Sequence, residues 1–172
     1  MGIAGVLNHA HGGWEGFVSS EFTDHDHKVA HRLTQYFEAG DLVLADSAYS
    51  SYELIVRLDL KGVNSLMPHH HARKIDFRKG QKIGSNERIC TWKKPRYKPR
   101  RSNLSDIEWS ELPDEMKMRI IRFWYTGKDG KQKRKHLVTT LLDHVKYGWK
   151  DLVALYLERW AIEIRFRGIK TT

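Results

Sequence analysis

The sequence predicts an α/β fold, and three features of one segment support this prediction. Residues 42–45 (LVLA) form a short continuous apolar run, typical of a strand buried on both faces, and the run ends at Asp46. Ser50 and Glu53 have the spacing of a capping box at the start of a helical pattern. Residues 63–67 (VNSLM) follow as the next strand. Functional groups in such sheets lie at the carboxyl ends of the strands, so Asp46 is a candidate site residue.

The N-terminal segment is expected to add two strands and a helix. Residues 2–8 and 13–22 read as short strands joined by a turn around AHGG. Residues 23–40 read as a helix, with Thr23 and Asp26 at capping-box spacing and a glycine as its stop.

The middle of the chain is expected to form an inserted β-rich lobe. From Pro68 to about Asp114 the chain consists of short basic pieces interrupted by Pro and Gly, with no helical period. Residues 118–143 then contain two β-rich runs around GKDG, a pattern typical of a hairpin. Residues 149–170 read as the last helix.

The charge of the chain points to a polyanionic partner. The net charge is +9 and the pI is about 9.7. Between Arg73 and Arg101 the chain has twelve basic and two acidic residues, interspersed with Phe77, Trp92 and Tyr97. Such a segment suits contacts with a phosphate backbone and with bases, although a solvated basic arm has the same composition. Trp92 is expected to lie in the core.

Two observations bear on location. No run of about 18 apolar residues is present, so the sequence predicts no membrane contact. The single cysteine, Cys90, cannot form an intramolecular disulfide, which is typical of a cytoplasmic protein.

The last helix carries an unusual stripe of polar residues. At 100° per residue, Tyr156, Arg159, Glu163 and Lys170 fall within a stripe about 60° wide, with apolar residues on both sides. Surface ion pairs would contribute only about 0.2–0.5 kcal/mol each. Charges in a partly desolvated groove are costly unless something binds them. The stripe therefore suggests a bound metal ion and a phosphate diester.

A strand-end aspartate and a glutamate on a late helix suit metal-dependent phosphoryl chemistry. Divalent ions such as Mg²⁺ prefer carboxylate oxygens, and two ions can assist both the attacking and the leaving oxygen. Asp46 and Glu163 are the candidate ligands, and a third carboxylate is expected.

Several segments resemble the insertion-sequence-four family of bacterial DDE transposases. Residues 40–55 resemble the segment around the second catalytic aspartate of that family. Residues 76–95 and 136–143 are similar to its insertion lobe and to the strand before its last helix. The family signature Tyr-x2-Arg-x3-Glu-x6-Lys is matched by Tyr156, Arg159, Glu163 and Lys170.

The resemblance implies a ribonuclease-H-like core that cuts DNA at transposon ends and joins the 3′ hydroxyl to target DNA, using Mg²⁺ or Mn²⁺. It makes Asp46 the second and Glu163 the third catalytic, metal-binding carboxylate. It implies that Tyr156, Arg159 and Lys170 hold DNA phosphates. It further implies a bacterial protein of the cytoplasm, associated with the nucleoid, and allows a homodimer of the full-length protein.

The sequence departs from the family at the first catalytic aspartate, which the resemblance places on an earlier strand. Only 45 residues precede Asp46, and Asp24 and Asp26 lie at a predicted helix start, where they are expected to act as caps. We therefore expect a truncated transposase, inactive alone. Its expected regions are a core lacking its first strand (1–67), the inserted lobe with the hairpin (68–142) and a truncated catalytic helix (143–172).

Two other functions fit parts of the sequence. A non-catalytic module could bind nucleic acid through residues 73–101 alone. A ribonuclease-H-like nuclease with a rearranged triad would need a carboxylate beside Asp46, from Glu15 or Glu21.

Overall fold

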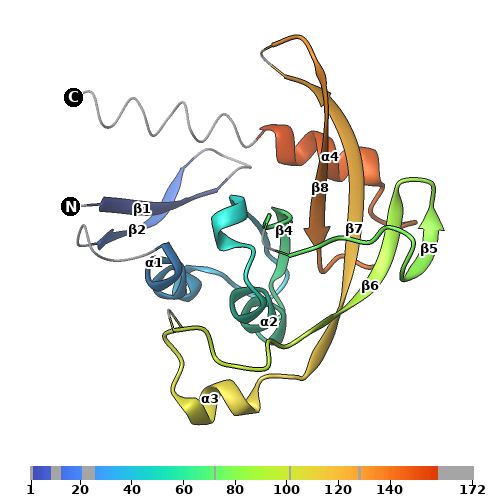
Figure 1. Ribbon diagram of the computed structural model, residues 1–172. Coiled ribbons are helices and arrows are strands. Elements are labelled where there is room, and N and C mark those ends of the chain that lie inside the picture. The colour runs from blue at the N-terminus through green and yellow to red at the C-terminus, as the bar shows by residue number, and fades with distance from the viewer. Residues whose placement is uncertain are drawn as a thin grey trace.

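The chain folds around a mixed sheet with helices on both faces (Figure 1). The computed structural model describes residues 2–8, 13–20, 26–71, 73–100, 102–127 and 129–158. The strands are β1 (Gly2–Leu7), β2 (Trp14–Ser20), β3 (Leu42–Leu44), β4 (Asn64–Pro68), β5 (Gln81–Gly84), β6 (Glu87–Lys93), β7 (Glu115–Thr126) and β8 (Gln132–Thr139). The helices are α1 (Asp26–Leu33), α2 (Tyr52–Leu60), α3 (Asp106–Glu111) and α4 (Trp149–Glu158), with short 3₁₀ turns η1 (Thr34–Tyr36) and η2 (Ser47–Tyr49). The predicted α/β class is confirmed.

The main sheet has the strand order β3-β4-β8-β7-β6-β5. Strands β3 and β4 are parallel and joined through α2, with Leu44 opposite Leu66, whereas the other neighbours are antiparallel. The predicted strand-helix-strand unit is therefore confirmed. The expectation that residues 42–45 form a strand buried on both faces is wrong, because β3 is half-buried and forms an edge of the sheet among the described residues.

The predicted inserted lobe continues this same sheet. Strands β5 to β8 fall within the predicted lobe, yet β8 pairs directly with β4, from Leu66 opposite Thr139 to Pro68 opposite Leu137. The predicted hairpin is confirmed, since β7 and β8 pair as far as Thr126 opposite Gln132. The division into three regions at residues 67 and 142 stays a prediction.

The sequence reading missed helix α3, which lies inside the segment expected to lack helices. Its start is a complete capping box. The Ser105 hydroxyl accepts from the Glu108 backbone N–H at 3.2 Å, and the Glu108 carboxylate accepts from the Ser105 backbone N–H at 2.7 Å. The pattern Ser-x-x-Glu was therefore the available signal.

Helix α1 ends earlier than predicted. It covers Asp26–Leu33 and is followed by the 3₁₀ turn η1, so the helical prediction is confirmed for residues 26–33 and wrong for residues 37–40, whereas residues 23–25 lie outside the described residues. Gly40, the predicted stop, has φ of 99° and donates its N–H to the Gly62 carbonyl at 2.9 Å. Thr23, the predicted cap, lies outside the described residues.

Alternate residues of the strands pack into two cores on opposite faces of the sheet. Ile120 lies in the core beneath α2, together with buried Ile55 and Leu58. Ile121 lies in the core beneath α4, which we call the α4 core, together with Leu152 and Tyr156. The alternation follows from the two-residue period of a strand. Within the described ranges, no helix combines the length and hydrophobicity needed to cross a membrane.

The N-cap of α2 is Ser51, one residue later than predicted. The Ser51 hydroxyl accepts from the Leu54 N–H at 3.2 Å. The preceding Ser50 belongs to the end of η2, and its N–H donates to the Ser47 carbonyl at 3.1 Å. The residue that was expected to cap the helix therefore caps the C-terminal end of the 3₁₀ turn instead.

Ser51→Ala is expected to lower the free energy of unfolding by about 1 kcal/mol, because it removes this cap. Ser50→Ala is the matched control. Its hydroxyl is buried and makes no hydrogen bond with the described residues, so its removal should leave stability unchanged or slightly higher. Urea unfolding of both variants tests the assignment. A larger loss of stability for Ser50→Ala than for Ser51→Ala would show that Ser50 is the cap.

Candidate functional site

Asp46 lies at the carboxyl end of β3, as the sequence predicts. Its carboxylate Oδ1 accepts from the Ser47 backbone N–H and, at 3.0 Å, from the Ser47 hydroxyl, and this arrangement caps η2. The side chain is exposed. Since β3 and β4 are parallel, their carboxyl ends lie at the same end of the strands. Asp46 therefore lies at the end of the sheet where β4 ends at Pro68.

Tyr156 of the predicted polar stripe is buried. Its side chain is 1% exposed and packs in the α4 core. The Lys135 ammonium lies 5.6 Å from the centre of the ring. The burial shows that the ring is a core residue. Its predicted contact with DNA stays a prediction.

The other three residues of the signature, Arg159, Glu163 and Lys170, lie outside the described residues. Helix α4 begins at Trp149, as predicted, and is described to Glu158.

Of the two predicted metal ligands, only Asp46 lies among the described residues, so only its carboxylate can be compared with the ligands that a divalent ion requires. An exposed carboxylate at a strand end has the oxygen chemistry that Mg²⁺ and Mn²⁺ prefer. Within the part of the chain that the structure describes, no group of three or more His, Cys, Asp or Glu could hold a metal. Asp46 therefore fits the ion as one ligand, and the pairing with Glu163 stays a prediction.

The other carboxylates considered from the sequence lie elsewhere. Asp26 is the first residue of α1, so the prediction that it begins a helix rather than occupying a strand is confirmed. Glu15 lies on β2, where its Oε1 accepts from the Asn8 side chain at 3.0 Å. Asp24 and Glu21 lie outside the described residues.

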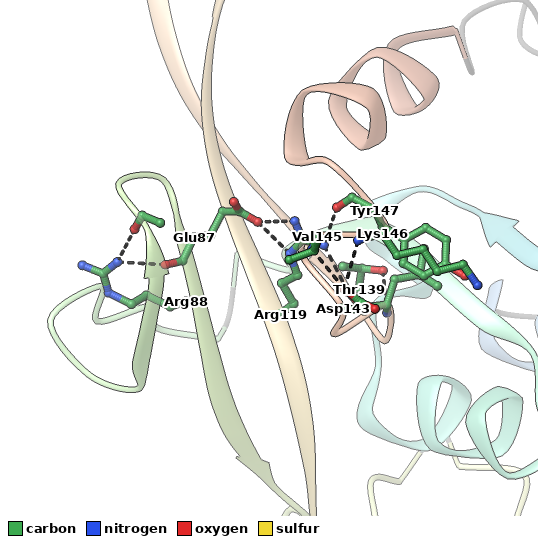
Figure 2. Close-up of polar contacts among 10 residues, drawn as sticks. Glu87, Arg88, Arg119, Thr139, Asp143, Val145, Lys146 and Tyr147 are labelled. Carbon is green, nitrogen blue, oxygen red and sulfur yellow. Dashed lines mark hydrogen bonds and ion pairs between the residues drawn. The ribbon is translucent and has the colours of Figure 1, made fainter.

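A buried ion pair holds the segment that leads into α4 (Figure 2). Arg119 of β7 is 0% exposed and its Nε donates to Glu87 of β6 at 2.7 Å. Its Nη1 donates to the carbonyls of Tyr147 at 2.8 Å and Leu141 at 3.3 Å. One guanidinium thus connects two strands to the loop before α4. The sequence reading missed Arg119, for which the signal was a charge inside the apolar run MRIIRF.

The same loop is closed by an aspartate (Figure 2). Asp143 Oδ1 accepts from the backbone N–H groups of Lys146 at 2.9 Å and Val145 at 3.0 Å. These bonds, the first of them above all, hold the pKa of the Asp143 carboxyl below its usual range. The loop therefore has a fixed shape before the chain enters α4.

Part of the basic segment 73–101 packs into the core instead of facing solvent. Trp92 is 5% exposed, which confirms its predicted core position, and the Arg73 guanidinium lies 4.0 Å from its ring centre. Tyr97, by contrast, is 74% exposed. The basic segment therefore combines structural and exposed aromatic residues.

His69 follows β4, at the same end of the strands as Asp46. Its ring contacts Trp92 edge-on, with the ring centres 5.9 Å apart. Burial, and then the positive neighbours His136 and Arg73, lower the pKa of His69 from 6.5 to about 4. His69 is therefore neutral at physiological pH.

The His69 pKa gives a prediction for stability. Between about pH 6.5 and pH 4 the unfolded chain binds a proton at His69 that the folded chain does not, so stability should fall as the pH is lowered through this window. NMR titration of the ring should give a midpoint near pH 4, and His69→Asn should reduce the pH dependence of thermal unfolding. A midpoint near 6.5 would contradict the burial of this ring.

Comparison with known proteins shows the family of the chain. A family model described as "Transposase DDE domain" matches residues 23–172. The relative "Transposase InsG for insertion sequence element IS4" of Escherichia coli (strain K12) is 26% identical over 153 residues, which are 86% of this chain and 30% of that relative. The chain thus spans less than a third of the length of this relative. No solved structure matches this chain. Since the family match covers most of the chain, the protein belongs to the DDE transposases of bacterial insertion sequences, and its similarity is consistent with the insertion-sequence-four group.

Proposed function

We propose that the chain forms part of a ribonuclease-H-like catalytic core that cuts DNA and transfers strands during transposition. Asp46 and Glu163 would be the second and third carboxylates of its site. The observation that carries the proposal is the exposed Asp46 carboxylate at the end of β3, inside a family match that also includes Glu163. The mixed sheet with helices on both faces is compatible with this core.

The described residues suggest how the site is held together. The Ser47 N–H and hydroxyl fix the Asp46 carboxylate at the sheet edge. The Arg119 pair and the α4 core fix α4 on the sheet. Glu163 follows Tyr156 by seven residues, about two helical turns, so a continued helix would place both on one side.

Asp46 and Glu163 together would hold Mg²⁺ or Mn²⁺, which, when bound, supplies positive charge to activate the attacking oxygen and stabilise the leaving one. Tyr156, Arg159 and Lys170 would orient the phosphate, Arg159 through its planar fork. Arg119 has a positioning role, since it reaches the site only through the loop before α4.

We further propose that these 172 residues provide two of the three carboxylates and perform no strand transfer alone. Losing one carboxylate weakens both metal binding and charge neutralisation. The purified chain, incubated with Mg²⁺ and transposon-end DNA, should leave the DNA intact. Mg²⁺-dependent cleavage that disappears in Glu163→Ala would contradict this.

Calorimetric titration with Mn²⁺ tests the proposed ligands. Asp46→Asn and Glu163→Gln should each weaken binding by about tenfold or more, because affinity depends on the number of charged ligands. Glu111→Gln, which removes an exposed carboxylate on α3, should leave binding unchanged. Equal binding by all four proteins would favour the non-catalytic nucleic-acid-binding module.

A further inference from the structure

The β7–β8 hairpin extends beyond the strands that flank it. Strand β6 pairs with β7 only as far as Ile121, and β4 pairs with β8 only as far as Leu137. Pairing between β7 and β8 continues to Thr126 opposite Gln132. Residues 123–126 and 132–135 therefore form a two-stranded ribbon, which no other described strand flanks. Figure 1 shows it in orange, projecting past its neighbours.

One face of the ribbon is already covered. Phe123 is 3% exposed and packs in the α4 core, and Tyr125 is partly buried against it. Lys135, opposite Phe123, lies over the Tyr156 ring. This face is occupied by α4.

The opposite face combines an exposed aromatic ring with two arginines. Trp124 is 50% exposed and is paired across the strands with the exposed Arg134. Arg122, at the base of the ribbon, has its guanidinium carbon 5.2 Å from the centre of the Trp124 ring. Among the described residues, neither guanidinium pairs with a carboxylate. The face therefore presents uncompensated positive charge.

The base of this face is held in place. The Phe77 ring contacts the guanidiniums of Arg122 and Arg88, whose central carbons are 4.4 and 4.8 Å from its centre. Arg88 in turn donates to the carbonyls of Phe77 at 3.1 Å and Gly84 at 2.9 Å. Arg122 is thus ordered without a ligand, and this order lowers the entropic cost of binding.

We propose that the Trp124 face of the ribbon binds the backbone of duplex DNA without a metal ion, with Arg122 and Arg134 on phosphates and the Trp124 ring against the sugars. A two-stranded ribbon has the width to enter the major groove, and planar guanidiniums suit phosphate oxygens. Repulsion between like charges argues against a second copy of this chain as the occupant. The inference takes DNA as the partner from the proposed function, but it concerns a surface other than the metal site.

Fluorescence anisotropy with a labelled duplex of arbitrary sequence, in EDTA and over a series of salt concentrations, tests the proposal. Each lost phosphate contact should reduce the slope of log K against log salt by about 0.9. Arg122→Gln with Arg134→Gln should therefore reduce the slope by about 2. Trp124→Ala should weaken binding with little change in slope.

The matched control is Lys61→Gln with Lys117→Gln, which removes the same charge from exposed positions outside both the ribbon and the basic segment 73–101. It should leave the slope nearly unchanged. Melting temperatures of all variants establish that each is folded. An unchanged slope in the arginine double variant, an equal loss in the control, or equally strong competition by duplex RNA would overturn the proposal.

The two proposals fail separately. Binding in EDTA should be the same for the native chain and Asp46→Asn, because it does not depend on the metal site. Loss of DNA binding in Asp46→Asn would show that the ribbon is not a separate DNA-binding surface. The Mn²⁺ titration tests only whether Asp46 and Glu163 are the metal ligands.

Discussion

Replacing Arg119 by alanine is expected to lower the free energy of unfolding by about 3–5 kcal/mol. The substitution leaves the carboxylate of Glu87, a residue that is 5% exposed, buried without its partner. It also removes the donor to the carbonyls of Leu141 and Tyr147. Urea unfolding, followed by circular dichroism, measures the loss.

A double variant separates the cost of an unpaired charge from the value of the pair. Glu87→Leu with Arg119→Met replaces the ions by apolar groups and should recover much of the stability, since buried ion pairs contribute little over well-packed apolar residues. Recovery should be incomplete because the two carbonyls still lose their donor. If Arg119→Ala cost less than about 1 kcal/mol, the pair would have to be solvated rather than buried.

Tyr156→Ala is expected to cost about 3–5 kcal/mol, as for other large aromatic residues removed from a core. The ring fills the α4 core together with Leu152 and Phe123, so its removal leaves a cavity between the helix and the sheet. Thermal or urea unfolding gives the magnitude.

Tyr156→Phe is the control for this prediction. It keeps the ring and removes only the hydroxyl, so it should retain most of the stability while abolishing any phosphate contact made by the oxygen. A small cost for Tyr156→Ala would show that α4 does not pack on the sheet through this residue.

Local patterns in the sequence predicted the parts of the fold that depend on neighbouring residues. The run LVLA, the following Asp46 and the next apolar run specified the β3-α2-β4 unit, because strand and helix periods are local properties. GKDG specified the β7–β8 hairpin for the same reason.

Features that depend on long-range contacts were not predicted. Nothing local indicates that β8 joins β4 and so merges the inserted segment into one sheet. Arg119 and Glu87 are 32 positions apart, so the sequence shows a charge in an apolar strand but not its partner. The choice between Ser50 and Ser51 as the cap depends on the preceding 3₁₀ turn.

The candidate site shows the same division. The strand-end position of Asp46 followed from the pattern, whereas the burial of Tyr156 depends on how α4 packs against β7 and β8. The helical stripe gave the relative directions of the side chains but not which side of the helix the sheet covers.

Iron-directed cleavage of the polypeptide tests most directly whether Asp46 and Glu163 share one divalent ion. Fe²⁺ in place of Mg²⁺, with ascorbate and peroxide, generates radicals that cut the backbone near the bound ion. If the two carboxylates share the ion, cuts are expected beside Asp46 and beside Glu163 in the same sample, both suppressed by excess Mg²⁺ and both lost in either Asp46→Asn or Glu163→Gln. Cuts at one segment alone, or cuts at Asp46 that persist in Glu163→Gln, would contradict it.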